Sequence, residues 1–301
     1  MSKNSNFRSD LSRRDAMLLA GGAFAAMTFA STAGAQDVSS KGAQAAKITQ
    51  VRNATLRIEY GDVRFLVDPM LGEVGSYPGV PGSAHSELRN PLVPLTTPVE
   101  DIINVDAVIV THLHMDHWDS AAKERLPKSL PIFSQNDEDA EKIRKDGFQD
   151  VRVLTETSEF KGVKLSKTEG QHGTDATMKV IGDRMGKVCG VAFSMPQYKT
   201  IYLAGDTVWN RHVQDAIAKH KPEVIILNAG NALFLGLDPI IMGMEDVLAV
   251  HKAAPEATLI ASHMEALNHC ILSRADLRAF SEKSGFSSNL LIPKDGETIS
   301  I

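Results

Sequence analysis

The chain has 301 residues, of which 43% are hydrophobic, 6% aromatic and 23% charged. These values are typical of a globular protein with a large core, and they exclude a disordered or fibrous chain. The formal net charge is −5. Because an acidic protein is repelled by phosphate backbones, we expect no nucleic acid as a partner.

Residues 1–35 have the composition of an export signal. Arg13 and Arg14 are followed by an apolar run over residues 16–30 and by small residues at 33–35, which is the pattern of a cleaved signal. The paired arginines predict the twin-arginine export machinery as a partner and a periplasmic location. The run is shorter than the ~20 apolar residues that cross a bilayer, so we expect no stable membrane anchor.

The rest of the chain reads as a short linker and one domain. Residues 36–47 are small and polar and predict a linker without fixed structure, followed by a single domain over 48–301. Cys189 and Cys270 are the only cysteines. A chain with a large core does not need a disulfide for stability, so whether these cysteines are bridged stays open, as does homo-oligomerisation.

Hydrophobic periodicity predicts strands and helices in chain order. The predicted strands lie at 48–51, 56–60, 63–67, 106–111, 151–154, 163–168, 187–195, 199–204, 224–227, 257–262 and 289–292. The predicted helices lie at 136–145, 209–219, 245–253 and 273–284. Strand-rich halves that are each followed by helices predict an α/β fold in which two sheets pack face to face with helices outside. Irregular segments at 70–98, a candidate lid, and at 231–243 have lengths that are often functional.

The stretch THLHMDHWD, residues 111–119, follows an apolar strand. In an extended chain His112 and His114 project to the same side, so both can bind one metal ion. Asp116 and His117 lie past the bend and would face a second position. A cluster of surface histidines would not explain three imidazoles and a carboxylate at the end of a buried strand, and we therefore predict a metal site.

Three further side chains that can bind metal follow predicted strands in matching positions: His172, Asp206 and His263. A Gly or Ser beside each permits a tight turn. The order HxHxDH, a lone His, GDT and a last His resembles the metallo-β-lactamase superfamily over nearly the whole predicted domain. That resemblance implies an αββα sandwich of two packed mixed β-sheets flanked by helices.

The resemblance also implies a ligand set. It assigns three residues to a first metal (His112, His114 and His172), three to a second (Asp116, His117 and His263), and Asp206 to a bridge between the two. The runs at 67–69, 204–209 and 263–270 look like the metal-dependent hydrolase group that contains ascorbate-6-phosphate lactonase. An Asp stands where a thiolate ligand would be found in the best-known β-lactamases, which argues against penicillin hydrolysis.

Two divalent cations that share a water lower its pKa and hold a hydroxide beside a polarised carbonyl or phosphoryl group. The ligand types suit Zn or Mn, and Fe is possible on the same grounds. We expect an exported metal-dependent hydrolase that cleaves a small ester-like bond, with a lactone as the leading substrate and Asp116 as the catalytic residue that orients the hydroxide or handles its proton. Phosphodiester hydrolysis and a metal-binding protein without turnover are the alternatives.

Five further residues carry weaker hypotheses. Asp68 could hydrogen-bond a ligand histidine or cap the turn after it. Asn228 could donate to substrate or form a turn. Glu265 and His269 could support the last ligand histidine or have surface and helix-cap roles. Arg89 could recognise an anionic substrate or be merely solvated.

Overall fold

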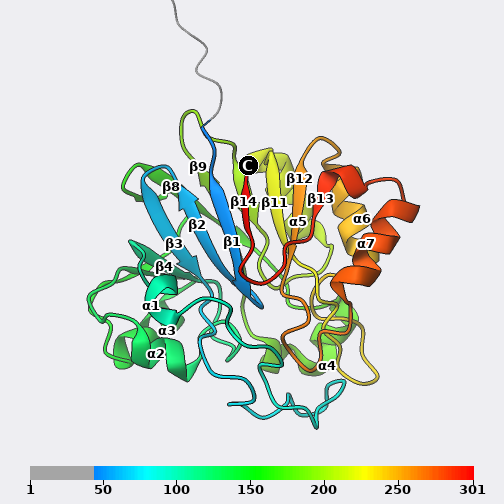
Figure 1. The fold of residues 1–301 in the computed structure, drawn as a ribbon, viewed down its shortest axis with the longest axis horizontal. Helices are drawn as coiled ribbons and strands as arrows, with labels where there is room; N and C mark the ends of the chain where they lie inside the picture. The colour runs from blue at the N-terminus through cyan, green and yellow to red at the C-terminus, as the bar shows by residue number, and fades with distance from the viewer. Residues whose placement is uncertain (1–43) are drawn as a thin grey trace, which may run out of the picture. The chain divides into compact units, whose positions relative to one another are not determined.

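Two seven-stranded sheets pack face to face in the computed structural model, which describes residues 44–301 (Figure 1). The first sheet contains, from edge to edge, β14 (Thr298–Ser300), β1 (Lys47–Arg52), β2 (Thr55–Tyr60), β3 (Val63–Val67), β4 (Ala107–Val110), β5 (Ile132–Ser134) and β6 (Val151–Val153). The second contains β13 (Leu290–Leu291), β12 (Thr258–Ser262), β11 (Val224–Asn228), β10 (Ile201–Leu203), β9 (Cys189–Ser194), β8 (Val163–Glu169) and β7 (Ser158–Phe160).

Helices cover the outer faces of both sheets (Figure 1). The first sheet is covered by α1 (Val99–Ile102), α2 (Ser120–Arg125) and α3 (Asp137–Lys145). The second is covered by α5 (Arg211–His220), α6 (Met244–Ala253) and α7 (Arg274–Lys283), and a 3-10 turn, η1, spans Ser287–Asn289. The remaining helix, α4 (Asp175–Met185), lies at the end of the sandwich that the segment 70–98 also occupies. This arrangement confirms the predicted αββα sandwich.

The strands are apolar on both faces because one face of each sheet packs on the other sheet and the opposite face packs on helices. In β3, Phe65 belongs to the core between the sheets, whereas Leu66 packs under the helices. In β11, Ile226 faces the other sheet and Ile225 faces the outer helices. Burial of each such side chain contributes roughly 1.5–3 kcal/mol, so this double coverage supplies most of the driving force for the fold.

Strand direction places the loops that carry the predicted site. The strands β3 to β6 are parallel. In the second sheet β10, β11 and β12 are parallel, and β8 shares their direction because β9 is antiparallel to both β8 and β10. In α/β folds, ligands bind outside the carboxyl ends of parallel strands, and all the predicted metal ligands follow such ends.

Several elements were not predicted: α4, which has 11 residues, and the shorter α1, α2, β5, β7 and β14. Most are too short to show a period. In α4, Val180 is exposed and the backbone at Ile181 is not helical (φ −127°, ψ 17°), so its apolar residues do not fall on one face. The predicted linker ends earlier than expected, because the backbone N–H of Ala46 already donates to Ile301 (3.1 Å) and β1 begins at Lys47.

Other predictions concern the termini and the thiols. The predicted export signal lies outside the described residues. Within residues 44–301, no helix is long and apolar enough to cross a membrane. Cys189 and Cys270 are free thiols, which settles the open question of a bridge between them in this structure.

Candidate metal centre

Four loops bring the seven predicted ligands together at one end of the sandwich. The loop after β4 supplies His112, His114, Asp116 and His117, and the loops after β8, β10 and β12 supply one residue each: His172, Asp206 and His263. They form two groups, and within each group one ligand atom per residue lies within 4.8 Å of the others. The groups are His112, His114 and His172, and Asp116, His117, Asp206 and His263.

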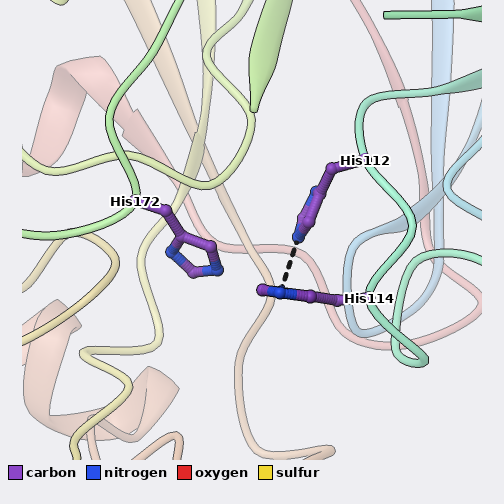
Figure 2. A group of neighbouring side chains, drawn as sticks. All are labelled: His112, His114 and His172. Carbon is purple, nitrogen blue, oxygen red and sulfur yellow. Dashed lines mark hydrogen bonds between the residues drawn. The ribbon is translucent and has the colours of Figure 1, made fainter. Parts of the chain in front are cut away.

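The first group joins two separate segments of the chain. Figure 2 shows His172 facing His112 and His114 across the space between their loops. The Nε2 atom of His112 is 3.0 Å from Nδ1 of His114. Burial and the neighbouring imidazoles lower the pKa of His112 well below its ordinary value, and burial lowers the pKa of His172 to about 4. Both rings are therefore neutral near pH 7, as a metal ligand must be.

Asp206 lies between the two groups. Its Oδ2 atom is 3.1 Å from Nε2 of His117, 3.4 Å from Nε2 of His172 and 3.9 Å from Nε2 of His112. Its Oδ1 atom is 3.6 Å from Nε2 of His263. One carboxylate thus faces imidazoles of both groups, which is the geometry that a bridging ligand requires.

The hydrogen bonds around the cluster fix the histidine tautomers in a form that fits a metal. Four rings have one nitrogen beside an outward acceptor, so that the other nitrogen turns its lone pair inward. These contacts are His112 Nδ1 to Thr111 Oγ1 (3.2 Å), His114 Nε2 to the Arg184 carbonyl (3.1 Å), His117 Nδ1 to Asp68 Oδ2 (2.9 Å) and His172 Nδ1 to the Ile240 carbonyl (2.9 Å).

Inward-facing lone pairs in such close contact call for a cation. The Nε2 atoms of His117 and His263 are 3.2 Å apart, and the first group has a similar contact between two nitrogens. Two lone pairs at this distance repel unless a proton or a metal ion lies between them. A donor set of imidazoles and carboxylates suits divalent transition metals, so the residues present fit the metal that the sequence predicts.

The buried charges of the second group also favour a bound metal ion. Burial would raise the pKa of Asp116 and Asp206, but the charges of His117 and His263 hold both well below the ordinary value. Burial would lower the pKa of His117 and His263, but Asp206 and neighbouring acidic groups raise both well above the ordinary value. Without a metal, protons on these imidazoles balance the buried carboxylates, and a dication would replace those protons.

Asp68 and Asn228 support the cluster from outside. Asp68 accepts hydrogen bonds from the backbone N–H and the hydroxyl of Thr111 (both 2.7 Å) as well as from His117. The structure thus gives Asp68 the first of its two predicted roles. The side-chain amide of Asn228 donates to Asp206 Oδ1 (2.6 Å) and does not line the cavity, so the predicted contact of Asn228 with substrate is wrong.

Of the two roles weighed for each residue, the structure favours the helix-cap role for Glu265 and an exposed side chain for Arg89. Glu265 accepts from the backbone N–H (2.8 Å) and the guanidinium (2.6 Å) of Arg274 at the start of α7, and it does not support His263. Arg89 is exposed and donates to the carbonyls of Gly75 (2.6 Å) and Ser76 within its own segment. Long charged side chains bind whichever carbonyl or ion partner is near, and the sequence pattern does not show in which direction such a side chain points.

Asn53 contacts the site and was not predicted. It occupies the turn between β1 and β2 with φ +55°. Its side-chain amide donates to the Asp116 carbonyl (3.0 Å), and its own carbonyl accepts the N–H of His263 (2.9 Å) and the hydroxyl of Ser262 (3.1 Å). In the sequence this residue looks like an ordinary turn Asn between two strands, and nothing nearby in the chain signals the contact.

A cavity of about 190 Å³ opens onto both groups. Its polar wall includes ligands of both groups, and also Arg184 and His269. Its apolar wall consists of Val80, Met115, Met185, Ala232, Phe234 and Ile240. Both irregular segments, 70–98 and 231–243, therefore contribute to the wall, and so does the unpredicted helix α4.

Comparison with known proteins places the chain in a family. The family model for the beta-lactamase superfamily domain matches residues 63–264. The UPF0173 protein YddR of Bacillus subtilis is 48% identical over 252 residues, which cover 83% of this chain and 98% of that protein. A UPF0173 metal-dependent hydrolase of Thermoplasma acidophilum is 24% identical over 65% of this chain and 81% of that protein.

Two solved structures are similar over almost their whole length. The crystal structure of an isothiocyanate hydrolase from Delia radicum gut bacteria is 48% identical, with a TM-score of 0.83, and the match covers 85% of this chain and 99% of that one. A possible metal-dependent hydrolase from Veillonella parvula is 42% identical, with a TM-score of 0.84, and the match covers 86% and 100%. With its paired groups of histidines and aspartates, the chain belongs to the metallo-β-lactamase superfamily and, within it, to the UPF0173 metal-dependent hydrolases.

Proposed function

We propose that this protein is a binuclear metal-dependent hydrolase that acts on the electrophilic carbon of a small, neutral and largely apolar substrate. The observation that carries the proposal is a cavity of about 190 Å³ that is lined by residues of both ligand groups and by apolar side chains. Two Zn or Mn ions are the cofactors we propose, with Fe as a further candidate, because imidazole and carboxylate ligands suit all three.

The charge of the cavity favours a neutral substrate over a phosphodiester. Among the described residues that line it, Arg184 is the single Arg or Lys. Its guanidinium donates to the Pro81 carbonyl (3.0 Å) and lies 4.5 Å from the centre of the Phe234 ring. The exposed large hydrophobic side chains within 44–301 also lie on segments that form the cavity wall or adjoin it: Val74, Leu88, Val180, Leu235 and Ile271. An apolar molecule would meet matching surface on its way in.

Isothiocyanates are the substrate class we propose first. The support is the similarity to an isothiocyanate hydrolase at 48% identity, together with the apolar wall. Hydroxide would add to the central carbon of R–N=C=S, and the nitrogen would take up the proton of the added hydroxyl. The C–N bond of the resulting thiocarbamate would then break as its nitrogen takes up a proton from water, which releases an amine and carbonyl sulfide. A lactone is the second class, supported by the resemblance of residues 263–270 to the lactonase group.

A bound metal pair would supply the hydroxide, because it lowers the pKa of a shared water toward neutrality. The chain itself would orient that water through Asp116, whose Oδ2 atom lies 3.1 Å from His263 Nε2 and 3.4 Å from His117 Nε2. The Asp116 side chain is 17% exposed and lines the cavity, whereas that of Asp206 is 3% exposed. Asp116 is thus placed to orient the water at the reacting centre, and Asp206 to hold the metals.

The test is a substrate comparison on protein loaded with Zn or Mn. Amine release from benzyl and allyl isothiocyanate, opening of a γ-lactone, and cleavage of bis(p-nitrophenyl) phosphate would be measured with and without a chelator. We expect chelator-sensitive turnover of the isothiocyanates that Asp116→Asn lowers at least a hundredfold while the metal stays bound. Faster cleavage of the phosphodiester would overturn the substrate class. Absence of turnover in all assays of metal-loaded protein would favour the metal-binding alternative.

We propose further that the chain is exported by the twin-arginine machinery to the periplasm. The support is the sequence of residues 1–35 alone. Export of a folded chain would let the metal centre be assembled in the cytoplasm before the protein crosses the membrane.

A further inference from the structure

His269 is a buried imidazole in the cavity wall that belongs to neither ligand group. Its side chain shares the wall with Asp116, His263 and Phe234. The residue is only 6% exposed, and its Nδ1 atom is enclosed without a hydrogen-bond partner among the described residues. An unpaired buried nitrogen costs roughly 1–3 kcal/mol, so a side chain of this kind requires an explanation.

The backbone holds His269 in place before any substrate arrives. Its carbonyl accepts the N–H of Leu233 (3.0 Å), and its ring lies beside that of Phe234 with the centroids 6.2 Å apart. The residue before it, Asn268, is tied to the predicted lid by hydrogen bonds to Val80 (3.1 Å), Ser83 (2.9 Å), Ala84 (2.6 Å) and Asn90 (2.7 and 2.8 Å). A ring anchored on both sides can contact a substrate with little loss of entropy.

The enclosed nitrogen indicates which atom faces the cavity. Since Nδ1 of His269 is inside the wall, the ring offers Nε2 to the cavity. A bare lone pair at Nδ1 is cheaper to bury unpaired than an N–H, which places the proton of the neutral ring on Nε2. Burial lowers the pKa of His269 to about 4, against the opposing charge of Asp116, so the ring is a neutral donor near pH 7.

We propose that His269 is a catalytic residue, whose Nε2–H donates a hydrogen bond to the heteroatom next to the attacked carbon as charge develops on it. The inference rests on the proposed function. In an isothiocyanate, addition of hydroxide forms a C–O bond and moves the C=N electron pair to nitrogen. The bond from His269 stabilises the charge that develops there until the nitrogen takes the hydroxyl proton. In a lactone the same donor would meet the carbonyl oxygen.

Three variants separate the hydrogen bond from packing. His269→Leu removes both nitrogens, His269→Asn places an amide near Nδ1, and His269→Gln reaches the position of Nε2. With isothiocyanate as substrate, we expect kcat to fall about a hundredfold in His269→Leu and His269→Asn, with KM nearly unchanged. Partial recovery of kcat is expected in His269→Gln. Each variant should keep the metal content of the parent, because His269 is in neither ligand group.

A binding measurement tests the role of His269 separately from the proposed hydrolase reaction. Titration of metal-loaded protein with δ-valerolactam, which is not expected to turn over, should show about tenfold weaker binding in His269→Leu than in the parent, with recovery in His269→Gln. If the parent turns nothing over but lactam binding follows this order, the proposed reaction fails and the donor role of His269 stands. Equal lactam binding in parent and His269→Leu, unchanged kcat in a working enzyme, or loss of metal in His269→Leu would each overturn the inference.

Discussion

The side-chain amide of Asn53 donates a 3.0 Å hydrogen bond to the carbonyl of Asp116. Because the carbonyl of Asn53 also accepts the N–H of His263 at 2.9 Å, one turn between β1 and β2 fixes two loops of the second ligand group. The contact joins residues 63 positions apart in the chain, and it sets how far Asp116 lies from the histidines around it.

The first prediction concerns this contact. At φ +55° an Ala would strain the backbone, whereas Asn53→Gly accepts that conformation and deletes only the amide. We expect kcat to fall about tenfold in Asn53→Gly, since small misplacements at a reacting centre are costly. In Asn53→Asp, which places a carboxylate beside the carbonyl of Asp116, kcat should fall further. Metal content and kcat would be measured together, and parent-like values in both variants would show that the turn does not position Asp116.

The second prediction concerns Asp68, which accepts from His117 Nδ1 (2.9 Å) and twice from Thr111. Asp68→Asn keeps the size but replaces one acceptor oxygen with an NH₂ group and removes the charge that polarises His117. We expect metal affinity to fall about 10–100-fold, as for other groups behind a ligand histidine. Competition against a chromophoric chelator measures this. Glu265→Gln, whose parent carboxylate binds Arg274 instead, is the matched control and should bind metal like the parent.

The third prediction is a pH dependence of stability away from the metal centre. Burial opposes ionisation of Asp106, but hydrogen bonds from Lys161 (2.8 Å) and from Arg64 (3.0 and 3.2 Å) lower its pKa from 3.8 to about 2. A lowered folded-state pKa adds stability that is fully present above the unfolded-state value near pH 4 and is lost as the pH falls through about 2.

The comparison of the parent with Asp106→Asn tests this pH dependence. The variant should be less stable by about 2 kcal/mol at pH 6, on the basis of 1.36 kcal/mol for each pKa unit. The difference should shrink between pH 4 and pH 2 in urea titrations of both proteins. A difference that stays constant over this range would mean that Asp106 acts through packing or neutral hydrogen bonds.

The fourth prediction concerns export. Replacing both Arg13 and Arg14 by Lys preserves the charge of the signal but removes the paired guanidinium groups that the twin-arginine route recognises. Active, metal-loaded protein should then accumulate in the cytoplasm, with little in the periplasmic fraction. Undiminished delivery to the periplasm by this variant would point to another route.

The candidate ligands could be predicted because they follow apolar strands, and the resemblance to the metallo-β-lactamase superfamily supplied their division into two groups. His112 and His114 are separated by one residue, and Asp206 follows a Gly that permits a turn. Asn53 could not be predicted, because its contact with Asp116 depends on how two distant loops meet. The part of the cavity wall that α4 forms could not be predicted either, because the apolar residues of this helix do not follow a helical period.

The sequence could not decide between the two roles weighed for Arg89 and for Glu265. Arg89 and Glu265 were candidates because charged residues near a site can contact substrate or ligands. Both instead bind groups in their own neighbourhood, Arg89 the carbonyl of Gly75 and Glu265 the start of α7 at Arg274. For long flexible side chains, the direction is set by tertiary contacts that the local sequence does not show. The His and Asp side chains of the ligand groups are short and follow buried strands, so the backbone fixes their direction much more closely.

Metal content per chain tests the central claim most directly, that two groups of ligands hold two ions. Protein purified without chelator would be analysed by mass spectrometry of the metals, alongside His172→Ala from the first group and His263→Ala from the second. We predict about two ions per chain in the parent and about one in each variant, because each substitution weakens one site and leaves the other. A single ion in the parent that both variants retain would contradict the binuclear centre.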